Sequence, residues 1–96
     1  MKIYNDINFD FQKYANQDDE LSHLFPDWVS YYRMKYAICK TINPTSILET
    51  GVRYGYSAIT FLNACPFARY LGIDNDSNTF GGSSGAIQYA KKILKD

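Results

Sequence analysis

One stretch of the chain, 46–62, most constrains the fold, because it changes from strand character to helix character across two glycines. Ile47 and Leu48 belong to a short apolar run of the kind found in buried parallel strands. Gly51 and Gly55 then bracket a tight turn, in which backbone without a Cβ can approach a ligand closely. The residues after the turn fit a helix, whose N-terminus attracts a carboxylate or a phosphate. A strand, a glycine turn and a helix N-terminus together predict a small-molecule site.

A second strand with an acidic end follows this helix. The helix is expected to end near Pro66, and the residues 68–74 have the pattern of a strand. Two strands joined through one helix are expected to be parallel, with a right-handed crossover. Asp74 lies 23 residues after Gly51, close to the spacing at which nucleotide-binding βαβ units place an acid on ribose hydroxyls. The residues 75–82 are expected to form a polar loop.

Helices are predicted on both sides of this unit. The acidic run 18–20 is interpreted as a helix start, and Pro26 suits the first turn of a longer helix over about 26–42. Arg33 or a tyrosine of that helix could close over a bound ligand, or Arg33 could be a solvated cation. A final helix is expected to be capped by Ser83 or Ser84 and to bury one apolar face, made of Ala86, Ile87, Ala90, Ile93 and Leu94.

The expected fold class is therefore α/β and Rossmann-like, with the first two parallel β-α units of a doubly wound sheet. The chain is interpreted as a single partial domain. Its N-terminal helical segment covers 1–43, and its ligand-binding β-α-β-α half covers 44–96.

Composition narrows the classes of function. Ten basic and ten acidic residues cancel, which argues against a dedicated nucleic-acid-binding protein. Cys39 and Cys65 form no CxxC or Cys/His pattern, so no metal site is expected, and both thiols are interpreted as small buried apolar groups in a reducing compartment. The chain shows no charged-then-apolar leader and no apolar run near 18 residues, so no membrane insertion is expected and the expected location is the cytoplasm. His23 is interpreted as an ordinary surface histidine.

The spacing of the glycines separates two kinds of ligand. A dinucleotide fold is expected to carry G-x-G-x-x-G, whereas this chain has Glu49-x-Gly51-x-x-x-Gly55. A pyrophosphate is repelled by a neighbouring carboxylate, and a ligand with an ammonium group is attracted by it. The pattern therefore favours S-adenosylmethionine over NAD, with another nucleotide-binding Rossmann protein as a less favoured alternative.

Over Thr45–Asp96 the chain resembles the class I S-adenosylmethionine-dependent methyltransferases. Glu49–Ala58 is similar to the first motif of the catechol-type O-methyltransferase branch, and Gly72–Asp74 is similar to the acidic end of the family's second strand. The resemblance implies transfer of a methyl group from S-adenosylmethionine to a small-molecule acceptor. In this family the substrate contacts, the base and any metal ligands come largely from strand 4 onward, so no catalytic residue is nominated. Arg53 departs from the small or aromatic residue often found at its position, and its role is open.

The resemblance also implies roles for individual residues. Glu49 would orient the glycine loop and attract the methionyl ammonium, Gly51 would present backbone to the methionine part, and Ser57 would bind its carboxylate. Asp74 would hold the ribose hydroxyls, and Asn75 or Asp76 would border the adenine. The full expected set of cofactor-binding residues is Glu49, Thr50, Gly51, Val52, Arg53, Gly55, Tyr56, Ser57, Asp74, Asn75 and Asp76.

An unpaired strand edge leads to the second hypothesis. Without a fourth strand beside it, the residues 47–50 would present an apolar edge that favours pairing with another chain, and two strands alone form a marginal sheet. The chain is therefore expected to be an N-terminal piece of a longer methyltransferase, or a homodimer that completes its sheet through the first strand. The alternative function is a non-catalytic binding or assembly module with the same fold.

Overall fold

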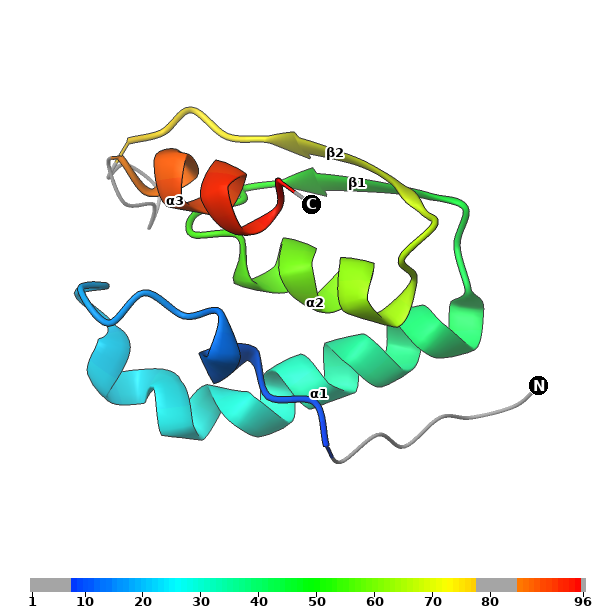
Figure 1. Cartoon of the computed structure of the whole chain (residues 1–96), viewed down its shortest axis with the longest axis horizontal. Coiled ribbons are helices and arrows are strands. Elements are labelled where there is room, and N and C mark those ends of the chain that lie inside the picture. The colour runs from blue at the N-terminus through cyan, green and yellow to red at the C-terminus, as the bar shows by residue number, and fades with distance from the viewer. Residues whose placement is uncertain (1–7, 78–84, 96) are drawn as a thin grey trace.

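The computed structural model describes residues 8–77 and 85–95 of the chain (Figure 1). These residues form a small α/β unit, which contains a two-stranded parallel sheet and three α-helices among the described elements. In chain order the elements are the 3₁₀ segments η1 (Phe11–Lys13) and η2 (Ser22–Leu24), then α1 (Phe25–Ile42), β1 (Ser46–Thr50), α2 (Tyr56–Ala64), β2 (Arg69–Ile73) and α3 (Ala86–Ile93).

The sheet confirms the predicted parallel pairing. β1 and β2 pair from Ser46 opposite Arg69 to Thr50 opposite Ile73, which sets Glu49 beside Gly72. Figure 1 shows α2 between the sheet and α1, so that these two helices lie on one side of the strands. Because side chains alternate across a strand, the inner face of β1 is half-buried and its outer face is exposed.

The long helix α1 follows the predicted range closely. It begins at Phe25, with Pro26 in its first turn, and it ends at Ile42. Asn43 adopts a left-handed conformation with φ of 51° and donates its N–H to the carbonyl of Cys39, which closes the last turn. Pro44 follows and cannot continue a helix. The last turns of α1 pack against the end of α2 in one of two apolar clusters, formed by Tyr36, Cys39, Ala64 and Cys65.

The second cluster explains the segment before α1, to which the sequence assigned no role. Phe11 is fully buried and packs against Phe25 and Tyr56, with ring centroids 5.5 and 5.4 Å away. Phe25 and Tyr56 meet edge to face at 5.6 Å. Aromatic pairs in this geometry stabilise by about 0.5–1.5 kcal/mol beyond the area they bury. The described part of the N-terminal segment is therefore a structural layer over α1 and the start of α2.

Four local predictions need correction or fall outside the described residues. The predicted helix start at 18–20 is wrong, because these residues form turns and Asp19 is buried as the partner of a distant arginine. α2 begins at Tyr56, one residue before Ser57, where the sequence predicts the helix start. α3 begins at Ala86, after Gly85, and the caps expected at 83 and 84 lie outside the described residues, as does most of the expected loop.

Candidate functional site

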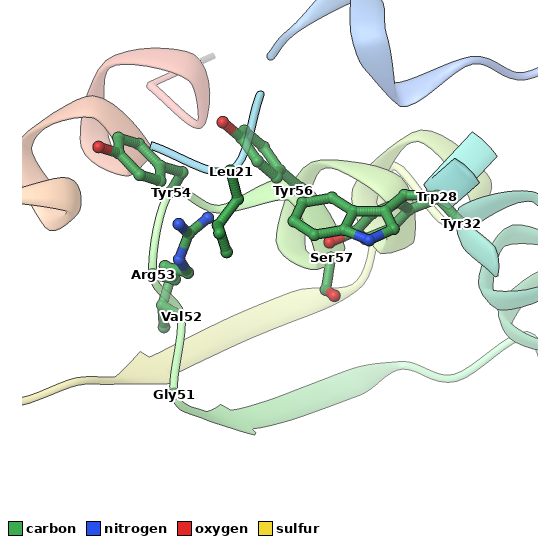
Figure 2. A pocket seen from close by; sticks show the side chains of 9 residues that line it. All are labelled: Leu21, Trp28, Tyr32, Gly51, Val52, Arg53, Tyr54, Tyr56 and Ser57. Atoms are coloured by element: carbon green, nitrogen blue, oxygen red, sulfur yellow. The ribbon is translucent and has the colours of Figure 1, made fainter. Parts of the chain in front are cut away.

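A cavity of about 220 Å³ lies where the β1–α2 turn meets α1 (Figure 2). The turn supplies one wall and two aromatic side chains of α1 supply another. The lining residues are Leu21, Trp28, Tyr32, Gly51, Val52, Arg53, Tyr54, Tyr56 and Ser57. Five of the sequence-predicted site residues therefore come together in one place, and Tyr32 of the long helix lines the same cavity. Arg33 does not, because its Nε donates to the carbonyl of Phe9.

The two glycines of the turn have different roles. Both have left-handed φ values, +81° at Gly51 and +86° at Gly55, a region that favours glycine. A Cβ added at Gly51 would meet nothing within 4 Å, so its backbone is open to a ligand. A Cβ at Gly55 would lie 2.9 Å from the Cβ of Ala90. Gly55 therefore lets α3 pack against the turn and does not face the cavity.

A lysine that the sequence analysis did not single out lies beside the start of α2. The Nζ of Lys35 donates to the Oγ of Ser57 at 2.7 Å, and it also lies 4.6 Å from the ring centroid of Tyr31. Lys35 and the cavity residue Tyr32 are three apart in α1, which places them on one helix face. That spacing is the signal that could have identified it. Its ammonium adds a positive charge to an N-terminus that already favours anions.

A carboxylate of opposite charge lies on the inner face of β1. Glu49 is half-buried and accepts a hydrogen bond of 2.6 Å from the hydroxyl of Tyr70. Burial raises the pKa of Glu49, while the Tyr70 hydroxyl and the charge of Lys35 act against that rise. Gly72 makes this contact possible, because a Cβ there would lie 2.8 Å from the Tyr70 hydroxyl. The last residue of β1, Thr50, is exposed and contributes nothing to the cavity lining.

Asp74 joins the end of β2 to the glycine turn. Its Oδ2 accepts the amide of Arg53 and its Oδ1 accepts the amide of Asp76, each at 2.7 Å. These backbone hydrogen bonds lower the pKa of Asp74, which keeps the carboxylate ionised. A carboxylate offers about four lone-pair sites, so two amides leave acceptor capacity for a further donor.

The two residues after Asp74 have local partners. Asn75 is exposed and accepts a hydrogen bond from the Ser77 hydroxyl. The Oδ1 of Asp76 accepts the amides of Gly85 and Ile87, at 3.0 and 3.3 Å, and so caps the start of α3. Asp76 therefore has a structural role that its position in the sequence did not indicate.

Arg53 is held by hydrogen bonds at its backbone amide, to Asp74, and at its side chain, to Asp19. Its guanidinium makes a two-pronged contact with Asp19, at 2.6 and 2.7 Å, and the hydroxyl of Tyr56 donates to the same carboxylate at 2.9 Å. Burial alone would raise the pKa of Asp19, but the Arg53 contact and the other hydrogen bonds outweigh it and lower that pKa. Arg53 also has a left-handed φ of 53°. The side chains of Arg53 and Tyr56 thus fix the wall of the cavity, and Val52 is buried beneath it.

The described residues contain no group of three or more His, Cys, Asp and Glu side chains arranged to hold a metal ion. His23 is exposed, apart from the cavity lining. Among the described helices, none has the length and apolar character needed to cross a membrane.

Comparisons with known proteins found no match among family models, curated proteins or solved structures.

Proposed function

We propose that the chain binds S-adenosylmethionine at the β1–α2 turn, as the donor-binding part of a Rossmann-like class I methyltransferase. The observation that carries this proposal is the pair of opposite charges beside the β1–α2 turn. Glu49 supplies a negative group, and Lys35 together with the N-terminus of α2 supplies a positive one. The methionine part of the donor carries an ammonium and a carboxylate on one carbon, so it matches both groups at once.

The state of Glu49 supports the ammonium end of this match. Its carboxylate is partly desolvated, and its pKa is raised by burial. A buried carboxylate gains strongly from a cation, because the attraction is less screened than in water. The ligand's ammonium would therefore favour the ionised form of Glu49 and lower its pKa again.

The arrangement around Ser57 supports the carboxylate end. Ser57 is buried in the first turn of α2, and its hydroxyl oxygen accepts from Lys35. A ligand carboxylate can accept from the Lys35 ammonium, from the Ser57 hydroxyl and from the free amides of the helix start. Charge-assisted hydrogen bonds of this kind are about twice as strong as neutral ones.

The cavity is large enough for only one part of the ligand. About 220 Å³ is less than the roughly 300–1,000 Å³ of pockets that enclose a drug-sized ligand. We therefore assign the methionine part to the cavity, beside Tyr32 and Ser57. The nucleoside would extend over Gly51 toward Asp74, whose remaining lone pairs can accept the ribose hydroxyls.

Methyl transfer is an in-line displacement from a sulfonium, which a protein accelerates mainly by positioning donor and acceptor. We assign no acceptor-binding or catalytic residue within the described chain, so the proposal for these residues is donor binding. The free thiols of Cys39 and Cys65 support a cytoplasmic location.

Calorimetric titration with S-adenosylhomocysteine, the donor without its reactive methyl, tests this proposal. The unaltered chain is expected to bind one equivalent, and Gly51→Ala is expected to weaken binding because the added Cβ occupies the open face of the turn. Gly85→Ala is the matched control, since Gly85 has a φ of +82° and the same open space around an added Cβ. It imposes the same backbone strain at the start of α3. If the unaltered chain releases no heat, donor binding is wrong for this chain.

A second candidate is a non-catalytic assembly module, and a specific observation favours it. On the outer face of the sheet Leu48, Leu71 and Ile73 are 65%, 61% and 53% exposed. A cavity of about 290 Å³ at the open side of β1 is also largely apolar, with Ile38, Ile42, Ile47, Leu48 and Phe61 among its lining residues. Exposed contiguous apolar surface marks a contact site. In this reading the chain forms a homodimer through the edge of β1.

A further inference from the structure

Two free thiols meet where the end of α1 packs against the end of α2. The Sγ atoms of Cys39 and Cys65 are 3.5 Å apart, although the two residues are 26 positions apart in the sequence. Cys39 lies in the last turns of α1, and Cys65 is the residue that ends α2. The Cys65 thiol also contacts the carbonyl of Cys39 at 3.4 Å, and the Cys39 thiol contacts the carbonyl of Phe61 at 3.7 Å. Each sulfur is therefore turned toward the other helix.

We propose that this pair is an oxidation site for small peroxides, at which hydrogen peroxide or an alkyl hydroperoxide converts the two thiols to an intramolecular disulfide. A disulfide has a sulfur–sulfur distance of about 2.05 Å. From 3.5 Å the two sulfurs need to approach by about 1.5 Å. The bond would tie α1 to the end of α2 across the interface that the two helices already share.

Two surface cavities give a small oxidant access to this buried pair. Cys39 lines the cavity of about 290 Å³ at the open side of β1, and Cys65 lines another of about 300 Å³ beside Pro66 and Phe67. A water molecule occupies about 30 Å³, so a peroxide little larger than water fits in either. Both cysteines are nevertheless buried. A bulky thiol or disulfide, such as glutathione, cannot bring its own sulfur onto theirs, which selects small peroxides as the oxidant class.

The two thiols have different parts in the reaction. Burial raises the pKa of Cys39 to about 12, with further contributions from its hydrogen bond to Cys65 and from the charge on Cys65. Cys39 therefore keeps its proton at neutral pH, and its thiol donates to the Cys65 sulfur, so the first attack on the peroxide is assigned to Cys65. The Cys65 sulfur attacks the peroxide, the O–O bond breaks, and a sulfenic acid and one molecule of water (or alcohol) result.

The second step closes the crosslink. The Cys39 sulfur attacks the sulfenic sulfur of Cys65, the S–S bond forms and the S–O bond breaks, and the Cys39 proton leaves with the departing hydroxide as water. Two thiols have then lost two protons and two electrons, and the peroxide has accepted them. No further reductant or oxidant is needed.

The expected consequence is a more stable fold. The disulfide closes a loop that contains β1, the glycine turn and α2, and a crosslink of this kind restricts the unfolded chain. For a loop of 26 residues the melting temperature is expected to rise by about 10 °C or more. The inference is independent of the proposed ligand, because neither cysteine lines the cavity at the glycine turn.

Titration of the reduced, folded chain with hydrogen peroxide tests the proposal. Four changes are expected. Both thiols are lost together, the mass falls by two hydrogen atoms, a peptide links Cys39 to Cys65, and the melting temperature rises. A small phosphine reductant should reverse all four. In Cys39→Ser the reaction should stop at Cys65 as a sulfenic acid, which dimedone traps and which gives no rise in melting temperature.

Three outcomes would overturn the inference. The thiols could stay free at peroxide concentrations that oxidise an exposed cysteine peptide, the mass could rise by added oxygen without a crosslink, or the crosslink could join two chains. All three are read on the unaltered chain, so the test does not depend on the folding of the variant. Cys65→Ser is a second variant, in which dimedone labelling should be weaker than in Cys39→Ser, because burial still raises the pKa of the remaining Cys39 thiol.

Discussion

Residues of the glycine turn divide between contact with a ligand and support of the fold. Gly51 leaves open space above its backbone, while Gly55 makes room for Ala90. The amide of Arg53 is bound by Asp74 and its side chain by Asp19. The glycine turn therefore has two roles. Gly51 faces the cavity, whereas Gly55 and Arg53 hold the surrounding elements in place.

At the residue scale the sharpest prediction concerns Lys35. Lys35→Met removes the ammonium beside Ser57 but keeps most of the side-chain volume. We expect affinity for S-adenosylhomocysteine to fall about 10- to 100-fold, because a hydrogen bond to a charged group contributes about 1.5–3 kcal/mol. Affinity for methylthioadenosine, which lacks the amino-acid part, should not change. Calorimetric titration of both ligands measures the difference.

Lys40→Met is the matched control for this substitution. It removes a lysine from the same helix, one whose Nζ lies 3.4 Å from the Tyr36 hydroxyl, away from Ser57. Both ligands should bind this variant as they bind the unaltered chain. Equal losses for the two ligands in Lys35→Met would mean that Lys35 supports the fold and not a ligand carboxylate.

A second prediction at this scale separates backbone strain from packing. Gly51→Ala and Gly55→Ala both force an L side chain into a left-handed conformation, which costs about 1–2 kcal/mol. Gly55→Ala also places a Cβ 2.9 Å from Ala90, and overpacking adds about 1–3 kcal/mol. Urea unfolding should therefore show a clearly larger loss of stability for Gly55→Ala. Equal losses would mean that α3 moves away from the turn without cost.

At the scale of elements, an ion pair between distant segments fixes the N-terminal layer to the glycine turn. The Asp19 side chain is fully buried and that of Arg53 is 19% exposed. Desolvation makes such a pair costly to form. Two parallel hydrogen bonds from Arg53 and one from the Tyr56 hydroxyl replace the hydration that the carboxylate loses. The pair thus ties the turn before η2 to the loop between β1 and α2.

Breaking this pair is predicted to be among the most damaging single changes in the described chain. Asp19→Asn leaves the Arg53 charge with only the exposed Glu20, at 4.0 Å, and removal of one member of a buried pair costs about 3–5 kcal/mol. Asp18→Asn, at the exposed neighbour, is the control and should change stability by less than about 0.5 kcal/mol. Urea unfolding at neutral pH measures both. A similar small effect of the two substitutions would contradict a structural role for the pair.

The same pair predicts how stability depends on pH. The folded pKa of Asp19 is lowered relative to an unfolded value of about 3.9, so the unfolded chain binds the proton more tightly. The contribution of Asp19 is therefore fully present above about pH 5 and is lost as the pH falls through the folded pKa. Acid unfolding followed by circular dichroism should show a steeper loss of stability below pH 4 in the unaltered chain than in Asp19→Asn.

Elements with local signals could be predicted, and contacts between elements could not. The period of apolar residues and Pro26 predicted α1 to within a residue, and the two strands followed from short apolar runs. The predicted helix start at 18–20 was wrong, because acidic residues in sequence look like a helix N-terminus while Asp19 is bound to Arg53, 34 residues away. Which side chains meet depends on how each helix is rotated about its own axis. The sequence of a single segment does not determine that rotation.

For the same reason, the sequence could predict only part of the candidate site. Gly51 and Ser57 lie in one local motif, so the sequence predicted them. Lys35 meets Ser57 from α1, 22 residues earlier, and only the packing of α1 on α2 brings it there. Cys39 and Cys65 likewise look unrelated until the two helices pack.

At the scale of the whole molecule, the described chain covers only one face of its sheet. Helices lie on the inner side of the strands (Figure 1), while Leu48, Leu71 and Ile73 are exposed on the outer side. The amide of Gly51 bonds to β2, as does the carbonyl of Thr45. By the alternation of a parallel ladder, the backbone groups of Leu48 point to the open side of β1, where a further strand could pair.

This geometry separates two kinds of dimer. A dimer through the edge of β1 buries Leu48 and leaves Ile73, on the far strand, exposed, whereas a dimer through the sheet face buries both. We predict a dimer through the edge, because the apolar cavity lined by Ile38 and Ile42 continues that edge. Leu48→Lys should then give a monomer in light scattering after size exclusion, since a charge at an unpaired edge opposes pairing.

The variant Ile73→Lys distinguishes the edge of β1 from the face of the sheet as the dimer contact. It places the same charge on the same face of the sheet, one strand farther from the edge, and should leave the dimer intact. Loss of the dimer in both variants would assign the contact to the sheet face. A monomer for the unaltered chain, at concentrations up to about a hundred micromolar, would contradict the dimer. Since a weak strand pair scarcely survives alone, the open edge would then need a partner other than a second copy.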